Sequence, residues 1–304
     1  MRCMVTGGAG FIGRWLCKSL LEKNNDVLCV DNLITGSETN IKEFMKNSRF
    51  SFMKHDIVQP LYVDGIDEIY HLASPASPIH YRKYNVETML ANSVGTMNML
   101  QLARENNAKF LFASTSEIYG DPKEHPQKET YFGNVNPIGP RACYDESKRF
   151  GEAMTTCFPD VYVRIIRIFN TYGPYMSAND GRVMPNLINQ ALTDKFMTIY
   201  GNGSQTRSFC YVDDLVKGIY VVMDNFHKGP VNLGNLNEIT ILELAEKIKQ
   251  LTNSKSKIIF HPLPKDDPTR RKPDITVARS LGWQPEINLN SGLEKTIEYF
   301  RQLK

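Results

Sequence analysis

A tyrosine and a lysine four positions apart, Tyr144 and Lys148, are the first residues of this chain whose types and spacing could do chemistry. On a helix, side chains with this spacing project from the same face. A tyrosinate can remove the proton of a sugar hydroxyl while a hydride leaves the same carbon, provided that the pKa of the phenol falls below its usual ~10. A neighbouring lysine cation and a positive nicotinamide ring would both lower that pKa. The pair therefore indicates dehydrogenase chemistry, with an unrelated pair on a helix surface as the alternative.

A second candidate site is a glycine-rich turn with glycines at Gly7, Gly10 and Gly13, between a predicted strand and a predicted helix. Glycines allow a tight turn and let the backbone approach a pyrophosphate at the N-terminus of the helix. Asp31 ends the next strand, where a carboxylate accepts hydrogen bonds from ribose hydroxyls and repels a 2′-phosphate. The pattern predicts NAD rather than NADP. An ordinary glycine-rich turn, and a phosphate contact by Arg14, are the alternatives.

The elements that must position these residues alternate along the first half of the chain. From residue 1 to about 170, short apolar runs rich in β-branched residues alternate with amphipathic stretches. This pattern is typical of a parallel sheet covered by helices, so we expect an α/β fold with a Rossmann-type doubly wound parallel sheet. The predicted strands are 2–6, 26–30, 50–54, 68–72, 110–114 and 161–168, and the predicted helices are 11–24, 85–106 and 142–158.

After Asn170 the pattern changes to shorter pieces broken by Gly, Pro and Asn. We expect residues 1–170 to form the main part of an NAD-binding domain. Residues 171–304 should form mainly a smaller C-terminal α/β region that binds substrate, with some segments returning to the Rossmann sheet. Helices are predicted at 183–193, 212–225, 241–251 and 291–302.

Composition excludes several classes of protein. The net charge of +3 arises from 36 basic and 33 acidic residues without a polybasic block, so neither nucleic acid nor a membrane surface is an expected partner. The six cysteines are scattered without metal-ligand spacing, which favours reduced thiols and no metal site. The strand-like run begins at Met1, and no apolar run approaches the ~20 residues of a membrane span. We expect a cytoplasmic protein, with a trimmed anchor as the open alternative.

A hydroxyl-bearing segment ends the fifth predicted strand: Phe112-Ala113-Ser114-Thr115-Ser116-Glu117-Ile118-Tyr119-Gly120. With the Gly-x-x-Gly-x-x-Gly spacing and the Tyr144/Lys148 pair, it resembles the extended short-chain dehydrogenase/reductase family. The resemblance implies that Thr115 is the catalytic hydroxyl that bonds the reacting sugar oxygen. The NAD-binding residues are expected to be Gly7, Gly10, Phe11, Ile12, Gly13, Asp31, Asn32, Asp56, Ile57, Leu72, Ala73, Tyr144 and Lys148.

The residues after Thr115 distinguish groups within that family. The 4-epimerases usually carry small or neutral side chains there and the 4,6-dehydratases carry Asp-Glu, whereas this chain has Ser116 and Glu117. The Ser-Glu pattern is similar to the UDP-glucuronate decarboxylases, and the similarity continues through 71–78, 136–146, 167–171, 179–183, 203–207, 266–268 and 271–274. It implies oxidation of UDP-glucuronate at carbon 4, loss of carbon dioxide from the β-keto acid, and re-reduction to UDP-xylose without a metal.

The same resemblance implies roles for individual residues. Tyr144 would be the base and later the acid, with Lys148 as its electrostatic partner and ribose anchor, and Glu117 would manage a proton or position a water near carbon 5. The catalytic set is Thr115, Ser116, Glu117, Tyr144, Lys148 and Arg271. Arg271 would reach the substrate carboxylate, with Arg270 or a plain surface position as alternatives. The substrate-binding set is Tyr81, Thr115, Asn170, Arg182, Arg207 and Arg271, of which Tyr81 could equally be a core residue.

Two rival functions stay open at this point. A UDP-sugar 4-epimerase or 4,6-dehydratase would use the same scaffold, and a catalytically silent regulatory protein could bind the sugar nucleotide or NAD without reaction. The resemblance also implies a homodimer, with helices 85–106 and 142–158 as its interface, unless their apolar faces belong to the core. The chain departs from the family pattern at Arg14-Trp15, where Ser-His is common, and at Cys210. These departures leave the affinity for the cofactor open.

Overall fold

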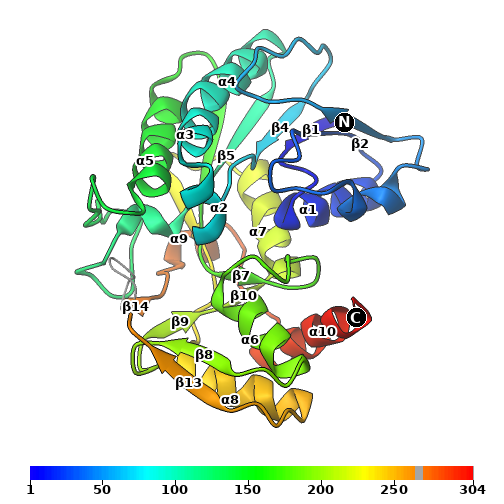
Figure 1. The fold of residues 1–304 in the computed structure, drawn as a ribbon. Helices are drawn as coiled ribbons and strands as arrows, with labels where there is room; N and C mark the ends of the chain where they lie inside the picture. Colours follow the sequence, from blue (N-terminus) through cyan, green and yellow to red (C-terminus); the bar gives the residue numbers. More distant parts are fainter. Residues whose placement is uncertain (264–269, 304) are drawn as a thin grey trace.

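The computed structural model describes residues 1–263 and 270–303 (Figure 1). Its centre is a seven-stranded parallel sheet with the strand order β11-β6-β5-β4-β1-β2-β3. Nearly all side chains of β1, β2 and β4 are buried, as expected for a parallel sheet that helices cover on both faces. In sheet order the strands are β11 (Pro230–Leu233), β6 (Tyr162–Ile168), β5 (Lys109–Thr115), β4 (Glu68–His71), β1 (Arg2–Thr6), β2 (Asp26–Asp31) and β3 (Phe50–Lys54).

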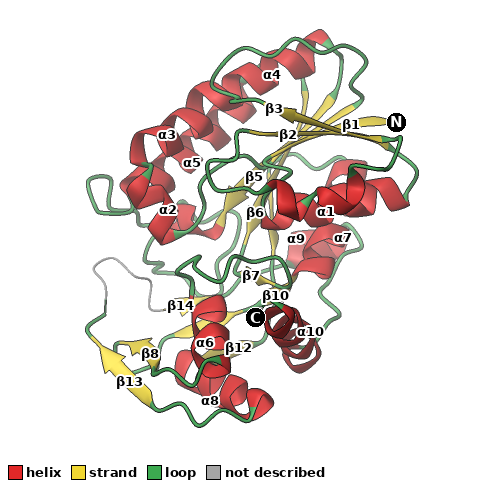
Figure 2. Cartoon of the chain, turned by 45° about the vertical axis from the view of Figure 1, so that its right-hand side comes forward, coloured by secondary structure: helices red, strands yellow, loops and turns green. Residues whose placement is uncertain are grey.

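Helices lie on both faces of this sheet (Figure 2). On one face α1 (Phe11–Glu22) packs against α7 (Val212–Asp224). The other face carries α3 (Asn85–Leu90), a π-helical segment (Ala91–Gly95), α4 (Thr96–Glu105) and α5 (Ala142–Cys157). The short helices are α2 (Pro78–Lys83), α9 (Thr276–Ser280) and the 3₁₀ turns η1 (Glu38–Asn40), η2 (Lys42–Phe44) and η4 (Ser116–Tyr119).

The remaining elements form a smaller α/β lobe, which lies below the large sheet in Figure 1. Its strands form three small sheets: the pair β7 (Thr171–Tyr172) and β10 (Cys210–Tyr211), the pair β8 (Met197–Tyr200) and β13 (Ile258–His261), and β12 (Glu238–Thr240) with β9 (Thr206–Ser208) and β14 (Arg270–Arg271). Its helices are α6 (Val183–Leu192), α8 (Ile241–Thr252) and α10 (Leu289–Gln302). A capping box starts α8, because Thr240 and Glu243 each accept the backbone N–H of the other.

The predicted α/β fold is confirmed, and the six predicted strands and the predicted helices are present with ends that differ by at most two residues. The predicted helix 85–106 is not regular, because its middle turn is π-helical. There Asn92 is buried against Ser147 of α5, and a side chain at Gly95 would come within 2.6 Å of Ile57. The sequence did not predict α2. It predicted that some segments of the second half return to the large sheet but not which ones, and β11 is such a segment.

The large sheet is the structural basis of the site, because its strands end at one edge. In parallel sheets of this kind, ligands bind where the carboxyl ends of the strands open into a crevice between flanking loops. Within residues 1–263 and 270–303, no helix is both long and apolar enough to cross a membrane.

Candidate active site

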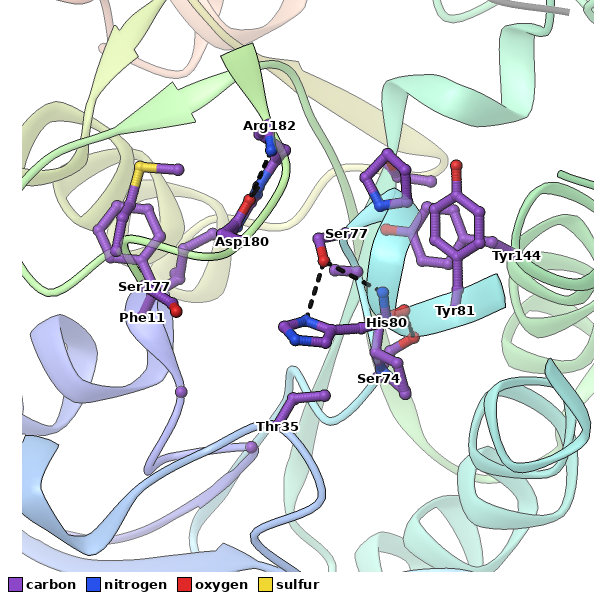
Figure 3. Close-up of a pocket in the computed structure, with 18 of the residues that line it drawn as sticks. Phe11, Thr35, Ser74, Ser77, His80, Tyr81, Tyr144, Ser177, Asp180 and Arg182 are labelled. Carbon is purple, nitrogen blue, oxygen red and sulfur yellow. Dashed lines mark hydrogen bonds and ion pairs between the residues drawn. The ribbon is translucent and has the colours of Figure 1, made fainter. Parts of the chain in front are cut away.

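A cleft of about 960 Å³ is lined by residues at the carboxyl ends of β1, β2, β4 and β5 and by residues of the smaller lobe. Figure 3 shows part of it, with Phe11, Ser177, Asp180 and Arg182 on one side and His80, Tyr81 and Tyr144 on the other. All cofactor-binding residues predicted from the sequence line this cleft, as do all predicted catalytic and substrate-binding residues except Arg271. Segments that are far apart in the chain therefore meet at one place.

The glycine loop between β1 and α1 is held in a shape that larger residues would disrupt. Gly7 has φ +69°, and its N–H donates to the carbonyl of Val30 at 2.8 Å. A Cβ on Gly13 would lie 2.2 Å from the carbonyl oxygen of Gly7, so only glycine fits there. Gly10 begins α1 without a side chain to cap it. The first N–H groups of α1 are thus available to an anion, and the loop fits the pyrophosphate of a dinucleotide.

Asp31 lies at the end of β2 and faces the same cleft. Its two carboxylate oxygens accept the backbone N–H groups of Ala9 at 3.0 Å and Leu33 at 2.8 Å. Burial raises the pKa of Asp31, and these two hydrogen bonds oppose that rise. A carboxylate fixed in this way beside a glycine loop fits ribose hydroxyls, which donate hydrogen bonds to it.

Arg14 gives no support to a phosphate contact. Its guanidinium pairs with Glu43 and does not line the cleft. It lies against the rings of Trp15, Phe44 and Tyr175 instead.

Thr115, Tyr144 and Lys148 come together as predicted. Thr115 ends β5 and begins η4, and Tyr144 and Lys148 lie one turn apart on α5. All three are buried, and Lys148 Nζ donates to the carbonyl oxygen of Ala113 at 2.8 Å. Burial lowers the pKa of Lys148 to about 7.

The pKa of Tyr144 differs from the sequence-based expectation. Burial raises it to about 12, and a hydrogen bond with the Thr115 side chain only partly opposes that effect. The residues of the chain alone therefore do not produce the low phenol pKa that the chemistry needs. A positive nicotinamide ring against Tyr144 would act in the required direction.

Tyr81 is packed like a core residue and also lines the cleft. Its ring stacks on Tyr144, with centroids 5.1 Å apart and an interplanar angle of 7°. Its side chain is almost fully buried, yet it lines the cleft, and its hydroxyl has no hydrogen-bond partner among the described residues. Such a hydroxyl fits a polar ligand atom.

Glu117 lies beside Thr115 at the centre of an arginine cluster. Its Oε2 accepts from Arg141 and, at 3.3 Å, from Arg271, and its Oε1 accepts from the hydroxyl of Ser116 at 3.3 Å. Burial alone would raise the pKa of Glu117, yet nearby guanidinium groups lower it to about 2. Those groups belong to Arg271, Arg141 and Arg207. Glu117 is therefore a carboxylate at neutral pH, and the cluster around it carries an excess of positive charge.

Arg271, which the sequence predicted to reach the substrate carboxylate, lies against Glu117. It is 1% exposed, and its Nη2 donates to Oε2 of Glu117 at 3.3 Å. Its strand β14 pairs with β9, and it is not among the residues that line the cleft. Its Nε and Nη1 atoms have no hydrogen-bond partner in the described part of the chain. Arg270 is exposed, so of the two arginines only Arg271 belongs to the cluster. The predicted motif residues 266–268 lie outside the described residues.

The three residues predicted to bind the diphosphate all line the cleft. The Nδ2 atom of Asn170 is buried and has no partner among the described residues, which fits a phosphate oxygen. Arg182 donates to Asp180, with Nε 2.6 Å from Oδ1, so its guanidinium is held in place before any ligand binds (Figure 3). Arg207 donates to the carbonyl oxygen of Thr206 at 2.9 Å.

Sequence reasoning assigned no role to Arg141, Asp180 or the hydrogen-bonded pair of Ser77 and His80, and all four line the cleft. Arg141 begins α5 three residues before Tyr144, and this helical spacing is a signal that could have identified it. No group of three or more His, Cys, Asp or Glu side chains in the described ranges is arranged to hold a metal ion.

Comparisons with known proteins agree with this geometry. The chain is 50% identical over 305 residues to UDP-glucuronic acid decarboxylase 1 of Arabidopsis thaliana, which covers 99% of this chain and 70% of the relative. It is 51% identical over 303 residues to UDP-glucuronic acid decarboxylase 1 of Danio rerio, covering 98% and 72% of the two chains.

A solved structure of UDP-glucuronic acid 4-epimerase from Bacillus cereus, in complex with UDP-glucuronic acid and NAD, resembles the whole chain. Its TM-score is 0.87 and its identity 27%, over 100% of both chains. Residues 3–234 match the NAD dependent epimerase/dehydratase family. Since this match covers more than half of the sequence, the chain belongs to the NAD dependent epimerase/dehydratase family.

Proposed function

We propose that this protein converts UDP-glucuronate to UDP-xylose with NAD as its cofactor. The support is twofold: relatives at about 50% identity are UDP-glucuronic acid decarboxylases, and a similar structure holds UDP-glucuronic acid and NAD. The observation that carries the proposal is the juxtaposition of the Thr115 and Tyr144 hydroxyls with the arginine cluster around Glu117. Hydroxyls suited to oxidation at carbon 4 thus adjoin cations suited to the carboxylate at carbon 5.

The cofactor side begins the reaction. The glycine loop and Asp31 would hold NAD, which would supply the acceptor for the hydride of carbon 4 and the donor that returns it at the end of the cycle. Tyr144 takes the proton of the carbon-4 hydroxyl, and Thr115 keeps that oxygen in place by a hydrogen bond. Lys148, in its protonated form, favours the tyrosinate through its charge.

Decarboxylation follows from the ketone at carbon 4, which makes the substrate a β-keto acid. The bond between carbon 5 and its carboxylate breaks, carbon dioxide leaves, and the bonding electron pair moves toward the carbon-4 oxygen. Thr115 and the protonated Tyr144 donate hydrogen bonds to that oxygen as its negative charge develops. Carbon 5 then takes up a proton, and Tyr144 finally returns its proton to the carbon-4 oxygen.

The low pKa of Glu117 narrows its role in this scheme. An ionised carboxylate between arginines accepts hydrogen bonds but has no proton to give. We therefore assign Glu117 to orienting a water molecule and the arginines near carbon 5, and not to protonating carbon 5 itself.

The rival functions fit the site less well. A 4-epimerase or 4,6-dehydratase would share Thr115, Tyr144 and Lys148, but the named relatives at about 50% identity are decarboxylases. A silent binder would not need the buried hydroxyl and ammonium groups that face the cleft. Burying such groups costs stability unless they have a function.

Product analysis tests the proposal. The purified protein is incubated with UDP-glucuronate, with and without added NAD, and products are identified by proton NMR while carbon dioxide is measured. The proposal predicts UDP-xylose and carbon dioxide with no net formation of NADH. Formation of UDP-galacturonate, or no reaction of a substrate that binds, would overturn it.

We further propose that the protein is a homodimer that associates through the outer faces of α3 and α5. These two helices pack against each other and carry exposed apolar side chains, among them Val86, Met89 and Phe150. Apolar clusters on a surface are typical of protein interfaces. Light scattering of the wild-type protein should give twice the chain mass, and Phe150→Glu should give the mass of one chain.

The expected compartment is the cytoplasm. All six cysteines are free, and Cys3, Cys17, Cys29 and Cys210 are buried. Unpaired thiols fit a reducing environment, because disulfides persist mainly in oxidising ones. Fractionation of the source cells with an antibody to the protein tests this assignment, and recovery from a secretory compartment would contradict it.

A further inference from the structure

Residues 173–182 form a strap that connects β7 to α6 and runs along one side of the cleft. Seven of its residues line the cleft: Tyr175, Met176, Ser177, Ala178, Asp180, Gly181 and Arg182. Figure 3 shows Ser177 and Asp180 on the same side as Phe11 of α1, across the pocket from Tyr81 and Tyr144. The strap therefore borders the space between the cofactor loop and the catalytic tyrosine.

The strap is fastened to the helix that starts at the glycine loop. The guanidinium carbon of Arg14 lies 3.4 Å from the centre of the Tyr175 ring, and the ring of Tyr299 lies 4.7 Å from that centre. The indole N–H of Trp15 donates to the carbonyl oxygen of Pro174 at 3.0 Å. Two successive residues of α1 thus hold two successive residues of the strap.

Arg14 has few other partners. It is 2% exposed and pairs with Glu43, but its Nε and Nη1 atoms have no hydrogen-bond partner among the described residues. A buried guanidinium in this situation depends on the faces of aromatic rings for much of its stabilisation, and desolvated cation–π contacts are the strong ones. Removing the Tyr175 ring would leave this cation poorly compensated.

Tyr175 also has a strained backbone. Its φ is +70°, in the left-handed region that bulky residues with a Cβ rarely adopt. Such a conformation persists only where surrounding contacts impose it, and it occurs often at ligand clamps and switch regions. The contacts with Arg14, Trp15 and Tyr299 are the ones that the structure shows at this position.

We propose that the contact between Arg14 and Tyr175 is a clasp that keeps the strap closed over the bound cofactor, so that the reduced cofactor stays in place between the oxidation and reduction steps. The proposal rests on the proposed function, because only a reaction that returns its hydride needs this retention. Arg14 directly follows Gly13, so the helix that receives the pyrophosphate also carries the clasp. Arg14 and Tyr175 are positioning residues, since neither needs to touch the sugar.

The clasp decides which product leaves. If NADH stays, the 4-keto pentose is reduced and UDP-xylose forms. If NADH leaves first, its two electrons leave with it, and the products are UDP-4-keto-pentose, carbon dioxide and NADH. Opening the clasp should thus change the ratio of products and increase the rate of cofactor exchange.

The test compares Tyr175→Ala with the matched control Tyr175→Phe, which keeps the ring and loses only the hydroxyl. The dissociation rate of NADH is measured by displacement with excess NAD and cofactor fluorescence, and hydrogen exchange of residues 173–182 is measured without cofactor. We expect Tyr175→Ala to release NADH about tenfold faster, as for loss of a desolvated cation–π contact. The backbone amides of residues 173–182 should also exchange hydrogen faster in this variant. Tyr175→Phe should match the wild type in both measurements.

A second variant keeps the test decisive if Tyr175→Ala folds poorly. Trp15→Phe removes one N–H donor to Pro174 and retains a ring, and it should release NADH faster than the wild type by a smaller factor. Unchanged NADH release in both Tyr175→Ala and Trp15→Phe would overturn the clasp. Faster release of NADH in the variants, with no decarboxylation of UDP-glucuronate by the wild type, would instead uphold the clasp and reject the proposed function.

Discussion

The two sides of the cleft are built from different kinds of atoms. On the cofactor side the glycine loop and Asp31 are held by backbone hydrogen bonds, and both carboxylate oxygens already have partners. On the sugar side, the hydroxyl of Tyr81 and the Nδ2 atom of Asn170 line the cleft and are buried without partners among the described residues. Buried polar groups without partners are costly, so a ligand that bonds these two atoms would remove that cost. The loop and the carboxylate on the cofactor side are therefore held in place before binding, whereas on the sugar side the substrate would supply the missing hydrogen-bond partners.

The largest expected effect comes from Tyr144, which is assigned a role on both the cofactor side and the sugar side of the cleft. Tyr144→Phe removes only the phenolic oxygen, and we expect kcat to fall by about 1,000-fold because general acid–base catalysis contributes on this scale. Binding of the UDP-sugar, measured by calorimetry, should change little. Tyr162→Phe is the control, because Tyr162 is 61% exposed on the surface. Full activity of Tyr144→Phe would remove the assigned base.

On the sugar side, Glu117→Gln should be the next largest change. It leaves Arg141 and Arg271 without their shared carboxylate, and we expect decarboxylation to slow by about 100-fold, as for loss of a group that organises charge in an active site. Single-turnover formation of carbon dioxide measures this step. Glu146→Gln, on the same helix as Tyr144 but paired with Arg149 at the surface, is the matched control. Equal effects of the two substitutions would contradict the role of Glu117 in orienting a water molecule and the arginines near carbon 5.

On the cofactor side, Gly13→Ala should act through the backbone. Its Cβ would collide with the carbonyl oxygen of Gly7, so the loop must move away from the shape that receives a pyrophosphate. We expect NAD to bind about 100-fold more weakly, which corresponds to ~2.7 kcal/mol. Lys18→Ala on the exposed face of α1 is the control, and NAD titration by fluorescence is the measurement. Unchanged binding would contradict the assignment of the loop.

The same contrast explains what the sequence could and could not predict. The cofactor side depends on local features, because Gly7, Gly10 and Gly13 form one turn and Asp31 directly ends a strand. Strand and helix patterns are also local, so the sheet could be predicted.

The arginine cluster could be predicted only in part. The family resemblance pointed to Glu117, Arg207 and Arg271, but not to the contacts that join Glu117 to Arg141 and to Arg271 across 24 and 154 positions of sequence. Nothing in the type of an arginine reveals whether it lies at the surface or under a carboxylate. The aromatic contacts of Arg14 are likewise fixed by the packing of α1 against a distant loop.

The lowered pKa of Lys148 predicts how the stability of the protein depends on pH. Its pKa falls from 10.5 in the unfolded chain to about 7 in the folded protein, so above pH 7 the unfolded state binds more protons. The free energy of unfolding of the cofactor-free protein should therefore rise with pH, by at most ~1.4 kcal/mol per pH unit. Urea unfolding between pH 7 and 8.5 measures this, before thiols with raised pKa values contribute. Lys148→Met should abolish the rise, and an identical slope in the variant would contradict the lowered pKa.

The smallest expected effect concerns Tyr81. Tyr81→Phe removes a hydroxyl that has no partner in the described residues, so the melting temperature should not fall. KM for UDP-glucuronate should rise about fivefold, as for one lost hydrogen bond. Tyr119→Phe is the contrasting variant, because the Tyr119 hydroxyl donates to Asn232 and accepts from Arg167, and its loss should lower the melting temperature. A destabilised Tyr81→Phe with normal KM would make Tyr81 a core residue only.

The most direct test of the whole account follows the hydrogen at carbon 4. UDP-glucuronate labelled with deuterium at carbon 4 is converted by the protein in ordinary water with excess unlabelled NAD, and the product is analysed by mass spectrometry and NMR. The account predicts UDP-xylose that retains its deuterium at carbon 4 and gains a solvent hydrogen at carbon 5. UDP-xylose without deuterium, or a labelled six-carbon product, would contradict a closed cycle of oxidation, decarboxylation and reduction in one cleft.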